Sequence, residues 1–240
     1  MGDGLRLALT TLTVLPVRPG RVDRRAAAVA MSVAPVVGIV LGLVLAGIDA
    51  GLSRIAPDLL AGAVTVATGV LLTRGLHVDG LADTTDALGS YRSGQAALEV
   101  MKKPDIGPFG VAAVVLALLI QAAAISPAAA VVAWTTGRLA ITVACRRGVP
   151  AARSEGLGAL VAGTVPVPVA AGLAVAAVAG AMWAVPGRPW QGPAAVAAAL
   201  SAVLLLLGHA VRRFGGVTGD VLGAVTEVAT TVTLVALALG

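Results

Sequence analysis

Three aspartates lie in the stretch HVDGLADTTDAL, residues 77–88, of a chain with only 12 acidic residues. Asp79, Asp83 and Asp86 follow the spacing i, i+4, i+7, which places them on one helix face, where neighbouring carboxylates repel one another. A Mg²⁺ ion would relieve this repulsion, because it takes carboxylate oxygens and keeps coordination positions for phosphate oxygens. The alternative is a solvated polar face, which the scarcity of acids elsewhere and the absence of interleaved lysines disfavour. We predict that all three aspartates bind Mg²⁺ and that Asp83 or Asp86 also accepts a proton in catalysis.

A second acidic stretch, GGVTGDVLGAVTE, occupies residues 215–227. Its glycines permit a tight turn with close backbone approach to an anion, so we predict that Gly216 and Gly219 contact a phosphate. Asp220 follows this turn, and Glu227 lies seven residues further, on the same side of a helix. Asp220 could serve only as a helix cap, whereas a carboxylate two turns into an apolar helix is costly and usually functional. We predict that both acids join the Mg²⁺ site.

Three basic residues are candidates for binding a substrate phosphate. Lys102 and Lys103 belong to the motif MKKPDIGPFG, where they could hold phosphate as point charges or anchor the chain at a membrane surface. Arg138 lies inside an apolar run, where it needs an acid or a phosphate as a partner. His77 and Asp105 adjoin these motifs, and we leave their roles open. Two separate histidines without Cys or His ligand spacing do not predict a zinc site.

The elements that must position these residues are membrane helices. The chain is 58% hydrophobic and 12% charged, with a mean hydropathy of +0.96, whereas soluble domains are about 25% charged. We therefore predict an all-α fold, a polytopic transmembrane helical bundle that forms a single integral membrane domain over residues 1–240. Seven apolar runs are candidates for spans: 26–48, 57–76, 109–125, 127–145, 157–185, 193–211 and 221–239.

The basic residues predict how this bundle is oriented. Fourteen lysines and arginines fall in the N-terminal segment and in alternate loops, against two on the other side. Because cytoplasmic loops hold the excess of these residues, we expect a cytoplasmic N-terminus and an active site on the cytoplasmic face of the cell membrane. The basic residues lie in separate loops, which does not indicate a nucleic-acid partner. The single cysteine, Cys145, is expected to be a free thiol in a reducing compartment.

Four stretches in this order resemble the cobalamin synthase family, also called the adenosylcobinamide-GDP ribazoletransferases. They are HVDGLADTTDAL, MKKPDIGPFG, RRGVPAARSEGLG at 146–158, and GGVTGDVLGA. The resemblance implies a Mg²⁺-dependent transfer that joins adenosylcobinamide-GDP to α-ribazole or its 5′-phosphate, gives adenosylcobalamin or its 5′-phosphate, and releases GMP. It also implies that the aspartates form the metal and phosphate site: Asp79, Asp83, Asp86 and Asp220.

Two positions differ from the family pattern. Lys103 stands where members often carry an acid, and Thr230 stands where a second acid commonly follows Glu227. The partners we expect are the corrinoid-GDP and ribazole substrates and the lipid bilayer. We expect no nucleic acid, and we leave a homo-oligomer open.

Two other functions would use similar residues. The CDP-alcohol phosphotransferases of lipid synthesis have a related DG-x-x-A-R core, but Asp83 stands in place of its arginine and the later G-x-x-x-D-x-x-x-D pattern is missing. A cation transporter would also explain acids and Arg138 in an apolar bundle. Transport sites, however, usually lie near the bilayer midplane, whereas most of these acids gather at one side of the expected membrane.

Overall fold

The computed structural model describes residues 2–18 and 20–239, and its secondary structure within them is helical. Two isolated β-bridges are the exceptions in these ranges, and no strand is formed there, which confirms the predicted all-α fold. The elements are α1 (Asp3–Leu12), α2 (Arg24–Leu52), α3 (Asp58–Leu72), α4 (Leu76–Gly89), α5 (Gly94–Val100), α6 (Pro108–Ala124), α7 (Pro127–Ala144), α8 (Gly156–Val161), α9 (Val167–Gly180), the 3₁₀ helix η1 (Ala181–Trp183), α10 (Gln191–Phe214) and α11 (Gly219–Ala238).

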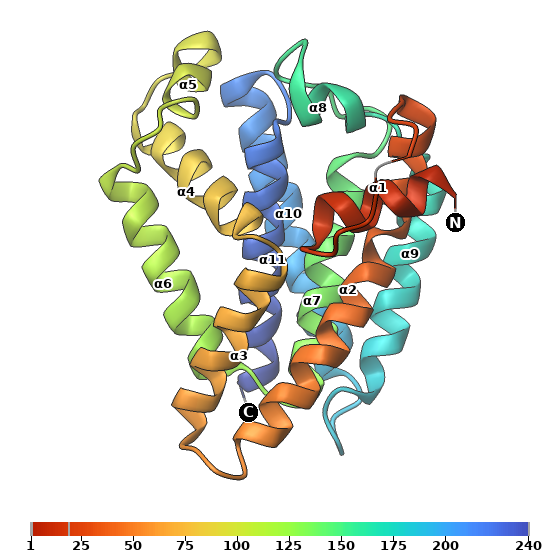
Figure 1. Cartoon of the computed structure of the whole chain (residues 1–240), viewed down its shortest axis with the longest axis vertical. Helices are drawn as coiled ribbons and strands as arrows, with labels where there is room; N and C mark the ends of the chain where they lie inside the picture. Colours follow the sequence, from red (N-terminus) through yellow and green to blue (C-terminus); the bar gives the residue numbers. More distant parts are fainter. Residues whose placement is uncertain (1, 19, 240) are drawn as a thin grey trace.

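The described residues include 4 helices long and apolar enough to cross a membrane, namely α2, α7, α10 and α11. A fifth crossing is available if α3 and α4, which are bent by 90° from one another, form a single span. Shorter apolar helices are α6 and α9 with η1. Each of the seven predicted runs therefore contains a helix, four of which are long enough to cross a membrane, and the polytopic bundle is confirmed. The exact number of spans and the cytoplasmic N-terminus stay predictions. Figure 1 shows the long helices along the longest axis, with α5 and α8 at one end.

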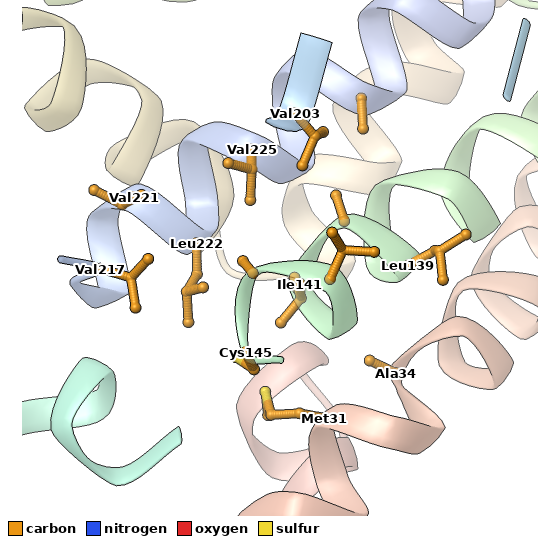
Figure 2. Close-up of a cluster of buried hydrophobic side chains, with 14 of the residues drawn as sticks. Met31, Ala34, Leu139, Ile141, Cys145, Val203, Val217, Val221, Leu222 and Val225 are labelled. Carbon is orange, nitrogen blue, oxygen red and sulfur yellow. The ribbon is translucent and has the colours of Figure 1, made fainter. Parts of the chain in front are cut away.

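Close packing around α7 forms the middle of the bundle. Gly38 and Gly42 of α2 lie directly against its backbone, because a Cβ at Gly42 would come within 2.7 Å of the Val131 Cα. Small residues of this kind let membrane helices approach closely. On the other side α7 packs against α11, and Figure 2 shows Leu139 and Ile141 within the shared apolar cluster. This apolar cluster packs α2, α7 and α11 tightly against one another.

The 90° bend between α3 and α4 sets the direction of the aspartate-bearing helix. Arg74 and Gly75 both have a positive φ, 56° and 67°, which ends α3 and turns the chain. Arg74 is fixed in this turn, since its Nη2 donates a hydrogen bond of 2.7 Å to the Thr10 carbonyl oxygen of α1. As a result α4 turns away from the direction of α3 and packs against α11 (Figure 1).

Candidate active site

Glycines allow α4 and α11 to cross with their backbones in contact. A Cβ at Gly80 would lie 2.6 Å from the Asp220 carbonyl oxygen, and a Cβ at Gly223 would lie 3.0 Å from the Gly80 Cα. Asp79 and Asp83 flank this crossing on α4, and Asp220 lies in the first turn of α11. The structure thus brings together the two acidic stretches of the sequence, although they are about 140 residues apart in the chain.

The start of α11 leaves the Asp220 carboxylate free of a capping role. Thr218 is the N-cap, because its Oγ1 accepts a hydrogen bond of 3.2 Å from the Val221 backbone N–H. The same hydroxyl donates to Asp220 Oδ2 at 3.2 Å. The alternative we considered for Asp220, that it only caps the helix, therefore does not fit these contacts.

A third segment, at residues 150–158, joins this crossing through backbone pairing. The Val217 N–H donates to the Pro150 carbonyl oxygen at 2.9 Å, and the Ala152 N–H donates to the Val217 carbonyl oxygen at 3.0 Å. Gly216 is buried against this segment, and a Cβ there would overlap the Pro150 carbonyl oxygen. Gly216 is therefore accounted for by backbone packing, and nothing in its contacts supports the phosphate contact that we predicted.

Several cavities adjoin the aspartates, among them one of about 440 Å³ lined in part by Arg74, Asp79 and Ile106. Two others lie beside the helix crossing. The lysine-side cavity has a volume of about 360 Å³ and includes Asp83, Asp86, Arg92, Lys103, Asp105 and Phe109 in its lining. The loop-side cavity has a volume of about 270 Å³ and includes Asp79, Arg153, Glu155, Thr218, Gly219 and Asp220. The four predicted aspartates, Lys103 and Gly219 therefore line space that could hold ligands. Lys102 is exposed and lines neither cavity.

The acids at the helix crossing lack close counter-ions. Among the described residues, the one ion pair within 4.0 Å joins Arg21 and Asp23, away from the crossing. On α4, the pKa of Asp83 is raised to about 7 by partial burial and by the negative charges of Asp220, Asp79 and Asp86, while Arg153 opposes the rise. Uncompensated carboxylates of this kind would be stabilised by a cation, which fits a Mg²⁺ site. As placed, no three Asp, Glu, His or Cys side chains in the described ranges form a complete metal site.

Asp86 contacts a different part of the chain from the other aspartates. Its two carboxylate oxygens accept hydrogen bonds from the backbone N–H groups of Gly107, at 2.7 Å, and Gly110, at 2.8 Å. A Cβ at either glycine would overlap the carboxylate. Asp86 thus caps the N-terminus of α6, a position that favours a negative charge, and this pairing explains the glycines of the motif DIGPFG.

Substitution of Asp86 is expected to affect stability more than chemistry. Asp86→Ala removes both acceptors from the start of α6 and should cost about 1 kcal/mol of stability, as loss of a helix cap does. Thermal unfolding of the detergent-purified protein would show this as a lower midpoint. Asp86→Asn keeps one acceptor and should have a smaller effect. A rise in the half-saturating Mg²⁺ concentration without any loss of stability would instead indicate that Asp86 is a metal ligand.

A separate set of buried polar side chains lies between α6, α7 and α11. Gln121 Nε2 donates hydrogen bonds to Glu227 Oε2, at 2.8 Å, and to Thr231 Oγ1, at 2.9 Å. Arg138 is 3% exposed and lies close enough to interact electrostatically with Glu227. His77, on α4, is also 3% exposed. None of these side chains lines the lysine-side or loop-side cavity, so their contacts do not support the Mg²⁺ role predicted for Glu227 or the phosphate role predicted for Arg138.

Three polar residues near these groups were missing from our sequence prediction. Arg92 lines the lysine-side cavity, and Arg153 lines the loop-side cavity. Gln121 is the partner of Glu227. Arg153 belongs to one of the four stretches that carried the family resemblance, and Gln121 is a lone amide in an apolar run. The sequence therefore contained a signal for Arg153 and one for Gln121.

The fold and this site define a polytopic helical membrane protein with a carboxylate-rich site at the crossing of two helices. The family model described as Cobalamin-5-phosphate synthase matches residues 4–238. The chain belongs to this family.

Individual relatives match along nearly the whole chain. A protein from Frankia casuarinae is 43% identical over 98% of this chain and 94% of its own length. One from Nocardioides sp. is 42% identical over 98% of both chains, and one from Desulforamulus reducens is 34% identical over 100% of this chain and 98% of its own. All three are named adenosylcobinamide-GDP ribazoletransferase. No solved structure matches the chain.

Proposed function

We propose that the protein transfers the cobinamide phosphate of adenosylcobinamide-GDP to α-ribazole or α-ribazole 5′-phosphate, a late step of cobalamin biosynthesis. The observation that carries this proposal is the crossing of α4 and α11, where Asp79, Asp83 and Asp220 gather without a close basic partner. Family membership and the names of the relatives supply the substrates. They also favour this reaction over CDP-alcohol phosphotransfer and cation transport.

The contacts support different roles for the aspartates. Asp79 and Asp220 line the same cavity and would hold Mg²⁺, which supplies positive charge for the phosphate oxygens when bound. Asp86 uses both oxygens on α6, so Asp83 is the better candidate for the general base. The Asp83 carboxylate would take the proton of the attacking ribazole 3′-hydroxyl. The oxygen–phosphorus bond then forms as the bond to GMP breaks, and GMP leaves with that electron pair.

The lysine-side and loop-side cavities suit a reaction with two substrates. Both are lined from α4, where Asp83 lines one and Asp79 the other, a single helical turn apart. A phosphorus held between these two aspartates would be reached from both sides, as in-line displacement requires. We further propose that the site faces the cytoplasm from the cell membrane, which the excess of basic residues at this end of the bundle supports.

The proposed base predicts a pH dependence. Asp83 is ionised above its pKa of about 7, and only the ionised form accepts a proton. The value of kcat/KM should therefore rise from pH 6 to pH 8 and then level off. A Mg²⁺ ion bound beside Asp83 favours the carboxylate, so a higher Mg²⁺ concentration should shift this rise to lower pH. Initial rates of GMP release, measured across pH at two Mg²⁺ concentrations, test both statements. A rate that falls over this range would exclude Asp83 as the base.

A further inference from the structure

Arg153 is held at the edge of the site by contacts on both sides. The preceding residue, Ala152, pairs through its N–H with the Val217 carbonyl oxygen at 3.0 Å, three residues before Asp220. The guanidinium reaches α5, where Nη2 donates a hydrogen bond of 2.9 Å to the Leu98 carbonyl oxygen. Arg153 therefore joins the loop after α7, the start of α11 and α5, which fixes its position relative to the carboxylates.

The guanidinium keeps hydrogen-bonding capacity that the protein does not use. Arg153 lines the loop-side cavity with Asp79 and Asp220, yet it forms no ion pair within 4.0 Å in the part of the chain that the structure describes. Its Nε is buried and has no hydrogen-bond partner there. The positive charge of Arg153 nevertheless acts on Asp83, because it opposes the rise in the pKa of that carboxyl. A fixed cation with free donors beside carboxylates that would hold a metal is suited to a substrate with several anionic oxygens.

We propose that Arg153 binds the diphosphate of the nucleotide-activated substrate in the loop-side cavity. This inference rests on the proposed function. The planar guanidinium can contact two phosphate oxygens at once, while Asp79 and Asp220, which line the same cavity, would hold the cation. It would also stabilise the negative charge that develops as the nucleoside monophosphate leaves. The lysine-side cavity, beside Asp83, then remains for the attacking nucleoside.

Arg24 provides a matched control for a purely structural arginine. Its Nη1 and Nη2 donate to the carbonyl oxygens of Ala159, at 2.7 Å, and Ala162, at 2.8 Å, and thus tie α2 to α8. It lines neither of the two cavities. If Arg153 only stabilises the fold through its hydrogen bond to Leu98, then Arg153→Ala and Arg24→Ala should have comparable effects on GMP release and on GDP binding.

The test measures GMP release and GDP binding for wild type, Arg153→Ala, Arg153→Lys and Arg24→Ala. We expect Arg153→Ala to lower kcat/KM for adenosylcobinamide-GDP by about 100-fold, with little change in the KM for α-ribazole. Arg153→Lys keeps the charge but not the planar fork, so its loss should be intermediate. The dissociation constant of GDP should rise by about tenfold in Arg153→Ala and stay unchanged in Arg24→Ala. Added guanidinium ion at millimolar concentration should restore part of the activity of Arg153→Ala alone.

The outcomes separate the two proposals. If wild type releases GMP and Arg153→Ala resembles Arg24→Ala in both assays, the role of Arg153 is overturned. A rise in the KM for α-ribazole with unchanged GDP binding overturns it too. If wild type binds both substrates and releases no GMP, the proposed function fails. Should Arg153→Ala not fold, Arg153→Lys decides, because equal GDP binding and equal kcat/KM in Arg153→Lys and wild type would contradict a bidentate contact.

Discussion

Replacing Asp83 with asparagine is expected to reduce the rate of GMP release from adenosylcobinamide-GDP by about 1,000-fold, the typical contribution of a general base. Asparagine has nearly the same shape but cannot take the proton of the attacking hydroxyl. It also removes a half-buried carboxylate whose pKa is raised by burial and by neighbouring acids. The folded protein should therefore be at least as stable as wild type while its activity is lost. Steady-state rates and thermal unfolding of the same purified sample would show both effects.

The other acids give the controls for this experiment. Asp79→Asn and Asp220→Asn should also abolish GMP release at low Mg²⁺, and higher Mg²⁺ should restore part of it, because these side chains are proposed as metal ligands. Glu227→Gln keeps an oxygen for the hydrogen bond from Gln121 and should leave the half-saturating Mg²⁺ concentration unchanged. Wild-type rates in Asp79→Asn, Asp83→Asn and Asp220→Asn together would show that the site has been assigned to the wrong residues.

The second large effect is expected from a substitution that touches no carboxylate. Gly80→Ala places a Cβ 2.6 Å from the Asp220 carbonyl oxygen and 3.0 Å from the Gly223 Cα, both of which are backbone atoms that a rotamer change cannot move. The helices α4 and α11 must therefore separate. A displacement of about 1 Å between reacting groups costs on the order of 100-fold in rate, and we expect at least this loss of GMP release.

Gly172 provides the control for the helix crossing. It lies in α9, and a Cβ there would meet nothing within 4 Å. Gly172→Ala adds the same methyl group and should leave GMP release unchanged. If Gly80→Ala and Gly172→Ala have equal activity and equal thermal stability, the close crossing of α4 and α11 is not what positions the aspartates.

The sequence predicted the helices and the common face of the three aspartates on α4 because both depend on local patterns. Apolar runs of membrane length predict helices directly, and the spacing of Asp79, Asp83 and Asp86 places them on one helix face. The bend after α3 was not predictable in this way. It depends on Arg74 in a left-handed conformation, which a non-glycine residue seldom adopts and which a tertiary contact with Thr10 supports here.

The different roles of the acids could not be predicted from their spacing. Spacing shows which helix face a side chain is on, but not which residues of other helices contact it. Asp86 shares the helix face of Asp83, yet α6 approaches it and takes both of its oxygens. Glu227 lies on the same side of α11 as Asp220 but two turns deeper, where Gln121 from another helix contacts it. The position of the stretch at 150–158 beside α11 was also not predictable, since its backbone pairing with Val217 forms only in the folded chain.

The central claim is tested most directly with purified wild-type protein, adenosylcobinamide-GDP and α-ribazole. We predict that GMP and adenosylcobalamin appear in equal amounts when Mg²⁺ is present, and that chelation of the metal stops both. If both substrates bind and neither product forms at any Mg²⁺ concentration, the proposed transfer at the α4–α11 crossing is contradicted.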